Sequence, residues 1–278
     1  MLGLVNGSFY ALLSLGLAII FGLLRVVNFA HGAFYMLGAL AAYLMLTWLG
    51  INYWFALLLG PLVVGLLGVI LERLFLRRLY NLDPLYGLLL TFGFALIAEG
   101  LTQQEFGSSG MSYPVPNALS GVVNLGFMVL PIYRLWVIVA SLAVCFVTWF
   151  VIECTSLGAT LRAATENAKL TQAFGINVPA IITLTYGAGV ALAALAGVLA
   201  APITQVSPQM GTTTVIVVFA VVVIGGMGSI LGSIVSGISL GVIEGLTKVV
   251  YPEASNTVVF VIMALVLVLR PAGLFGRA

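Results

Sequence analysis

The sequence predicts an all-α fold, a polytopic integral membrane bundle of helices. Three observations support this prediction. The mean hydropathy of the 278-residue chain is +1.24, 62% of its residues are hydrophobic and only 6% are charged. Apolar stretches long enough to cross a bilayer recur along almost the whole chain. An ordinary soluble domain does not have such a composition.

We expect eight or nine transmembrane helices, depending on how one interrupted stretch is counted. Residues 1–278 are treated as a single transmembrane domain, because the longest polar connection, about 102–133, is too short for a folded core. The first stretch has no basic start, so we expect a retained helix rather than a cleaved signal. The predicted spans are 4–23, 33–48, 54–71, 85–101, 134–152, 179–201, 214–247 (interrupted) and 257–269.

Basic residues gather in three regions: after the third span, in a polar segment near 153–178 and in the C-terminal tail. The connection 102–133, by contrast, contains Glu105 and no basic residue. The positive-inside rule therefore predicts that the three basic regions are cytoplasmic and that the connection is external. The basic residues are Arg73, Arg77 and Arg78, then Arg162 and Lys169, then Arg270 and Arg277.

The polar segment Glu153–Val178, called the docking element below, interrupts an otherwise apolar half of the chain. Arg162 and Glu166 fall in one helical pattern, Asn167 is suited to cap a second short helix, and Gly175 is suited to end it. We therefore predict two small polar helices on the cytoplasmic side. Such helices on a membrane protein indicate a binding surface for a partner.

A first break lies inside the apolar region 4–48, where Asn28 and His31 precede Gly32 and Tyr35. His31 is the only histidine of the chain. Polar groups near membrane depth are costly unless they face protein or water, so these residues are candidates for a translocation path. One interpretation is a broken helix that lines the path. The alternative is a short interfacial loop in which His31 caps a helix end.

A second break, Gly225–Gly232, resembles the first, because each leads through small residues into a helix. This similarity is a weak indication of two related halves with discontinuous helices. The candidate path residues here are Gly225, Gly226, Gly228 and Ser229. Further along, glycines recur at every fourth position, at 237, 241 and 245, and we expect them to allow close helix packing rather than substrate contact.

Two carboxylates, Glu99 and Glu244, lie within predicted spans. Ion coupling is one interpretation. Each is close to a polar boundary, at Thr102 or Lys248, so a salt link or a side chain that reaches the interface is favoured. Cys145 and Cys154 lack metal-ligand spacing and are expected to be buried free thiols.

The sequence contains little that indicates enzymatic chemistry. It has no phosphate-binding GxxxxGK[ST] loop and no cluster of metal ligands. The stretch Gly107–Gly110 matches the GxSG pattern of intramembrane serine proteases, but it falls in the predicted external connection. We therefore expect no catalytic residues and no bound metal.

Four segments, in order, resemble the permeases of branched-chain amino acid ABC importers. The first is Leu12–Tyr43; the second is Gly158–Val178 together with the helix that follows it; the third is Gly225–Ser229; the fourth is Leu269–Gly276. The likeness covers nearly the whole chain. It is closest to the first and shorter of the two related permease subunits.

The resemblance implies a subunit of the bacterial inner membrane that pairs with a second related permease around a central path. Two cytoplasmic ATPase subunits would dock on the docking element and use ATP and Mg²⁺, neither of which this chain would bind. A periplasmic binding protein would deliver the cargo, and no nucleic acid would be involved. By this resemblance the coupling residues are Gly158, Arg162, Glu166, Asn167 and Gly175, and both breaks approach the path.

The cargo stays open at this point. Relatives often carry an acid after the His-Gly pair, whereas this chain has Ala33. The family also includes importers of urea, short amides and aromatic acids. The alternative function is a secondary transporter or channel for a small polar solute such as urea or an amide. It would need no docking element, but it would need a carboxylate better placed for ion binding. An intramembrane enzyme is a third, weaker possibility.

Overall fold

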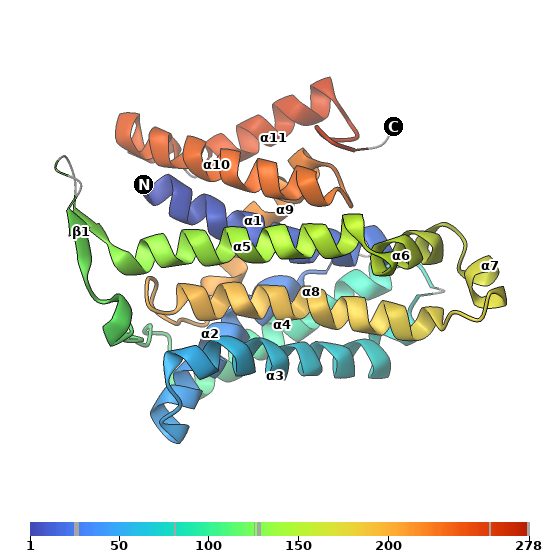
Figure 1. Cartoon of the computed structure of the whole chain (residues 1–278), viewed down its shortest axis with the longest axis horizontal. Coiled ribbons are helices and arrows are strands. Elements are labelled where there is room, and N and C mark those ends of the chain that lie inside the picture. Colours follow the sequence, from blue (N-terminus) through green and yellow to red (C-terminus); the bar gives the residue numbers. More distant parts are fainter. Residues whose placement is uncertain (25–27, 81, 125, 127–128, 256, 277–278) are drawn as a thin grey trace.

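The computed structural model describes the whole chain except residues 25–27, 81, 125, 127–128, 256 and 277–278. Its helices lie roughly along one common direction (Figure 1). Within the described residues, seven helices are long and apolar enough to cross a membrane, and two shorter apolar helices accompany them. The seven are α1 (Leu2–Leu24), α2 (Ala30–Leu49), α3 (Tyr53–Leu74), α4 (Pro84–Phe106), α5 (Ile132–Cys154), α8 (Val178–Ala200) and α10 (Ile230–Val250); the two are α9 (Met210–Gly225) and α11 (Val258–Leu269).

The interrupted stretch 214–247 consists of two helices, α9 and α10. Gly226 and Gly228 have φ angles of 102° and 86°, which only glycine adopts readily, and they form the turn between the helices. Ser229 then caps α10, because its Oγ accepts a hydrogen bond from the Gly232 amide at 3.1 Å. The described residues therefore contain nine apolar helices, of which seven are long enough to cross a membrane.

Helices α1 and α10 pack backbone against backbone and run antiparallel. Gly3 lies beside Gly245, Gly7 lies beside Gly241, and a Cβ on Gly237 would come within 2.5 Å of the Ala11 amide nitrogen. The expectation that the repeated glycines allow close packing is thus confirmed. We call this contact the glycine seam.

Helix α8 occupies the centre of the bundle, against α1, α2 and α3. On α3, Gly60 and Gly68 leave room for Val198 and Val190 of α8. Tyr186, in the middle of α8, is among the largest fully buried side chains. Any movement of α8 must therefore move several neighbouring helices.

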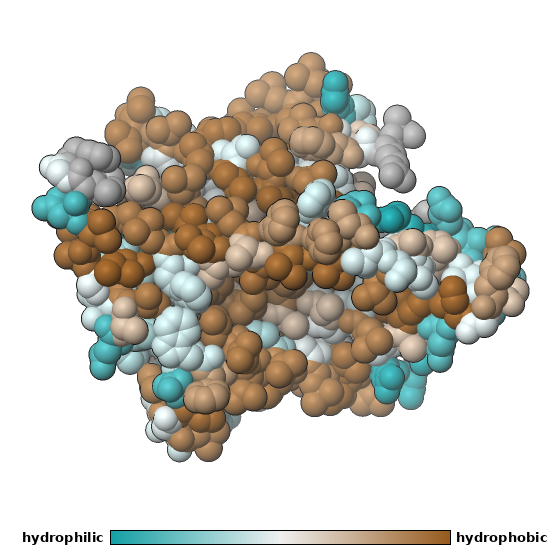
Figure 2. Space-filling view, viewed as in Figure 1, coloured by the Kyte–Doolittle hydropathy of each residue, from teal (hydrophilic) through white to brown (hydrophobic). Residues whose placement is uncertain are grey.

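The two ends of the bundle differ. At one end lie the 3₁₀ turn η1 (Leu76–Arg78) and two short helices, α6 (Ser156–Glu166) and α7 (Ala168–Ala173), which extend beyond the long helices. At the other end, β1 (Val122–Asn124) and β2 (Val129–Pro131) form an antiparallel hairpin with Val123 opposite Leu130, and a 3₁₀ turn, η2 (Asn117–Leu119), precedes them. Figure 2 shows hydrophobic surface along the helices and hydrophilic residues gathered towards both ends. A last 3₁₀ turn, η3 (Pro252–Ala254), joins α10 to α11.

The two ends of the bundle separate the basic regions from the polar connection, as the orientation prediction requires. The described basic regions, at residues 73–78, 162–169 and 270, share the end opposite to the 102–133 connection. Arg277, which belongs to the same prediction, lies outside the described residues.

The first predicted break is shorter than expected, because α2 already begins at Ala30. His31, Gly32 and Tyr35 therefore lie inside α2, and Asn28 lies just before it. His31 meets the carbonyl of Leu13, which is halfway along α1. The start of α2 thus lies at the depth of the middle of α1, and it is not an interfacial loop.

The two cysteines differ, and the expectation that both are buried is wrong for one of them. Cys145 is buried within α5, whereas Cys154 is exposed at the end of that helix. Both are free thiols. The difference follows from position, since α5 leaves the bundle where the docking element begins.

Candidate functional site

Besides the chain itself, one arginine and one glycine hold the docking element against the end of α5. Arg162 Nη1 donates to the Ile152 carbonyl at 3.0 Å and lies 3.2 Å from Glu153 Oε2. Gly158 packs so closely on the Ile152 carbonyl that any Cβ would collide with it. Arg162 therefore caps the end of α5 and holds α6 in a fixed position against it.

The second short helix has the ends that the sequence predicts. Asn167 Oδ1 accepts a hydrogen bond from the Leu170 amide at 3.0 Å and caps α7. Gly175, with a φ of 82°, ends this part of the chain. Asn177 then caps α8 through the Ala180 amide at 3.1 Å. The docking element thus leads directly from α5 into the central helix of the bundle.

The outer surface of α7 combines apolar side chains with charges. Phe174 is 77% exposed and Leu170 is 56% exposed, although both lie at the polar end of the bundle. Glu166 and Lys169 are exposed beside them. Large apolar side chains rimmed by charges, on helices that extend beyond the long apolar ones, are typical of a protein-binding surface.

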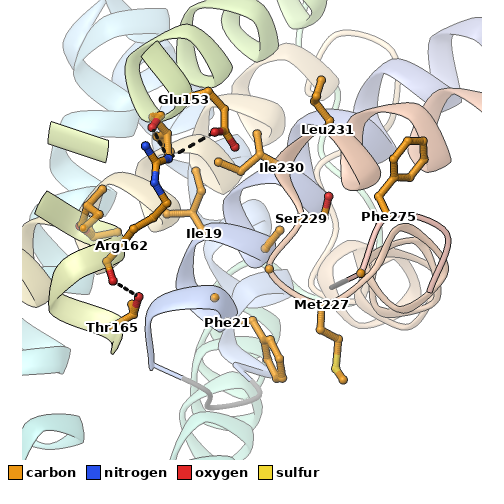
Figure 3. A pocket seen from close by; sticks show the side chains of 17 residues that line it. Ile19, Phe21, Glu153, Arg162, Thr165, Met227, Ser229, Ile230, Leu231 and Phe275 are labelled. Atoms are coloured by element: carbon orange, nitrogen blue, oxygen red, sulfur yellow. Dashed lines mark hydrogen bonds and ion pairs between the residues drawn. The ribbon is translucent and has the colours of Figure 1, made fainter. Parts of the chain in front are cut away.

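A cavity of about 730 Å³ opens between α6 and the start of α10 (Figure 3). Arg162 and Thr165 line one side, Ile19 of α1 lies behind, and Met227 and Ser229 line the other side. The cavity therefore joins a predicted coupling residue, Arg162, to predicted path residues, Gly228 and Ser229.

The two remaining glycines of the second break do not reach this cavity. Gly225 and Gly226 are buried, and the C-terminal segment covers them. Leu274 donates its amide proton to the Ile224 carbonyl at 2.8 Å, and Phe275 donates to the Gly225 carbonyl at 3.1 Å. These bonds satisfy the last carbonyls of α9.

The candidate path residues of the first break lie elsewhere, and side chains of this same chain bury them. His31 and Asn28 are each 1% exposed. The ring Nε2 of His31 donates to the Leu13 carbonyl at 2.9 Å, and Asn28 Nδ2 donates to the Tyr186 hydroxyl at 3.2 Å. Gly32 packs on Gly211 of α9 and the backbone of Tyr35 packs on α8. In this conformation these residues fix the start of α2.

The family comparison agrees with this architecture. The family described as "branched-chain amino acid transport system / permease component" matches residues 1–269. The chain belongs to this permease family. It is a multi-pass membrane protein, as its apolar helices indicate.

Three relatives illustrate the similarity. The permease is 31% identical to the high-affinity branched-chain amino acid transport system permease protein BraD of Pseudomonas aeruginosa, over 99% of this chain and 94% of BraD. It is 30% identical to LivH of Escherichia coli K12, over the same shares of the two chains. It is also 28% identical to LivM of Salmonella typhimurium, over 95% of this chain and 67% of LivM. No solved structure matches the permease.

Sequence reasoning missed one buried acid of the permease, Glu72. Its side chain is 0% exposed, and it accepts hydrogen bonds from Thr183 at 2.6 Å and from Tyr80 at 2.8 Å. Burial, and next the hydrogen bond to Glu72, raise the pKa of Tyr80, so its hydroxyl stays a donor. The contact with Thr183 joins α3 to α8. In the sequence, Glu72 stands next to Arg73 near the end of a predicted span, so sequence reasoning favours a charge at the membrane interface and gives no sign of its burial.

The two carboxylates that the sequence did single out have different partners. Glu244 pairs with Lys248 at 2.6 Å and accepts a hydrogen bond from Tyr10 at 2.7 Å, so the expected salt link is confirmed. Glu99 instead accepts a hydrogen bond from Thr212 of α9 at 2.6 Å. The sequence offered no signal for this contact, since the two residues are 113 positions apart.

Proposed function

We propose that this chain is the permease subunit of an ATP-driven importer in the bacterial inner membrane. Together with a second related permease it forms the path for branched-chain amino acids that a periplasmic binding protein delivers. The family match over residues 1–269 supports this assignment. Relatives named LivH and LivM both match this chain, which supports a pair of related permeases.

The observation that carries the proposal is the docking element. A secondary transporter or channel has no use for two short helices, α6 and α7, that extend beyond the bundle. In our proposal each of two cytoplasmic ATPase subunits binds one permease at the exposed surface around Leu170 and Phe174. The ATPases bind ATP and Mg²⁺, and this chain is not an enzyme.

Movement of the docking element reaches the path through fixed contacts. Arg162 and Gly158 attach α6 to the end of α5. At its other end the docking element continues into α8, and Thr183 of α8 is bonded to Glu72 of α3. When the ATPases close, α5, α8 and α3 therefore move together with α6 and α7. This rigid movement switches the permease pair between outward-open and inward-open arrangements.

The inner end of the path is the cavity of about 730 Å³ beside Gly228 and Ser229. It adjoins Arg162, so displacement of α6 changes its shape directly (Figure 3). The first break, at Asn28 and His31, is where α2 starts at mid-depth. We propose that this first break approaches the path when the helices rearrange.

Transport by the complete complex tests this proposal. The permease is co-expressed with its partner permease and ATPases, purified through a tag on this chain and reconstituted in proteoliposomes. With loaded binding protein outside and Mg-ATP inside the vesicles available to the ATPases, we expect leucine uptake that a non-hydrolysable ATP analogue abolishes. Uptake by this chain alone, driven by an ion gradient and indifferent to ATP, would establish the secondary transporter instead.

A further inference from the structure

A second, smaller cavity of about 120 Å³ lies between α2, α4 and α9. Its walls are apolar, and they include Phe92 and Leu96 of α4 and Val215 of α9. Glu99 and Thr212 contribute the two polar side chains among its lining residues. Gly32, a predicted path residue, also lines it.

The carboxylate of Glu99 differs in its partners from the other acids of the helical core. In the part of the chain that the structure describes, the ion pairs are Arg162 with Glu153 and Lys248 with Glu244. Buried Glu72 accepts two hydroxyl hydrogen bonds. Glu99 accepts one, from Thr212 to Oε2, and its Oε1 is free to accept another. A carboxylate within a membrane helix is stable when a cation neutralises it.

The position of Glu99 makes it reachable. It lies about two turns before the end of α4 and one turn before the polar residues that begin at Thr102, which places it in the outer part of this helix. Thr212, Leu96 and Ile216 are exposed around the cavity. The cavity is therefore open at the surface of this subunit rather than closed within it.

The walls suit a compact aliphatic group. Phe29 packs on Phe92 and Phe219 with ring centroids 6.1 Å and 4.9 Å away, which fixes one wall. Gly32 and Gly211 touch through their backbones and close the floor. A dry cavity of about 150 Å³ accommodates benzene. A cavity of about 120 Å³ therefore has room for a branched group of four carbons.

The geometry assigns this cavity as a binding subsite for the cargo. Glu99 accepts a hydrogen bond from the primary ammonium of an amino acid, and Phe92, Leu96 and Val215 contact its branched aliphatic side chain. The assignment rests on the proposed function and adds the place where the permease holds its cargo. Its chemical class is a primary ammonium joined to a small branched hydrocarbon.

Uptake by the complete importer in proteoliposomes provides the first test, with E99Q as the variant. It keeps the shape of the side chain and removes its charge. We expect leucine uptake at sub-saturating cargo to fall about tenfold or more, as loss of a charge-assisted hydrogen bond implies. ATPase stimulation by loaded binding protein should stay within about twofold, because the docking element is unchanged. T212V should reduce uptake less, about threefold.

The matched control is E105Q, a charge-neutralising change on the same helix at an exposed position. It should leave uptake unchanged. If E99Q transports as well as E105Q, the subsite is refuted while the proposed function stands. If even the wild-type complex shows no ATP-dependent leucine uptake, the proposed function itself fails.

Direct binding separates a cargo role from a structural role of Glu99. Saturation-transfer NMR on the detergent-purified complex uses two probes, 3-methylbutylamine and 4-methylpentanoate. The amine has the ammonium and the branched chain, whereas the acid lacks the ammonium. We expect the amine to bind the wild type at least about fivefold more strongly than it binds E99Q, and the acid to show no difference between them. Equal binding of the amine to both proteins would overturn the assignment.

Discussion

The glycine seam and the joint between α5 and α6 connect helices in opposite ways. At the seam, Gly241 of α10 lies directly on the backbone of Gly7 in α1, with no side chains between them. At the joint, an exposed arginine side chain contributes, since Arg162 bonds to the Ile152 carbonyl and pairs with Glu153, in addition to the close packing of Gly158. The seam lies along the length of the bundle, whereas the joint lies at its polar end.

This difference indicates which contacts a side-chain substitution can release. Two backbones in direct contact have one packed arrangement and cannot adjust by a rotamer change, so α1 and α10 move as one body. At the joint the exposed ion pair contributes about 1 kcal/mol or less, so α6 is held there by the bond of Arg162 to the Ile152 carbonyl together with the packing of Gly158. The contact of Glu72 with its hydroxyl partners is intermediate between the seam and the joint, because it is buried like the seam but made by side chains.

Filling the glycine seam should have the largest effect on stability. In Gly241→Leu the new side chain would collide with the backbone of Gly7, which cannot move aside. We expect a loss of about 3 kcal/mol or more in the free energy of unfolding, measured by thermal unfolding of the purified complex. Gly93→Leu is the control, because no atom lies within 4 Å of a Cβ added there. Equal melting temperatures for the two variants would contradict the packing described here.

Removing the buried charge between α3 and α8 should have an intermediate effect on stability. Glu72→Gln leaves an amide group among two hydroxyl donors, so one hydrogen bond is lost in a buried site. The expected cost is about 1–3 kcal/mol. Thr183→Val tests the same contact from α8, and the double variant should cost less than the sum of the single variants. Strict additivity would mean that the two residues do not act together.

Removing the cap of α7 should have the smallest effect on stability. Asn167→Ala loses the bond to the Leu170 amide, at a cost of about 1 kcal/mol that is confined to α7. Hydrogen exchange should therefore accelerate in residues 168–173 while the melting temperature stays nearly constant. Asn52→Ala removes an equivalent cap from α3 at the other end of the bundle. In the Asn52→Ala variant, hydrogen exchange should accelerate only in the first turn of α3.

The sequence predicts the membrane spans well, because each depends on local hydropathy. The helix bounds of α3 and α8 differ from the predicted spans by at most three residues. The docking element is likewise predictable, since Asn167 and Gly175 are local signals for helix ends.

Contacts between distant residues are not predictable in this way. The burial of Glu72 depends on Thr183, which is 111 positions away. The depth at which α2 begins depends on the bond from His31 to Leu13, and the sequence alone left an interfacial loop open. The partner of Glu99 is on α9, and no periodicity links it to α4.

ATPase stimulation in the Arg162→Glu variant tests the coupling account most directly. The change places a second carboxylate beside Glu153 and removes the bond to the Ile152 carbonyl, so α6 is no longer held on α5. Arg78→Ala, an exposed basic residue at the same end, is the control. We predict that the variant complex assembles at the wild-type level but loses nearly all stimulation by loaded binding protein. Stimulation equal to that of the wild type would contradict the account.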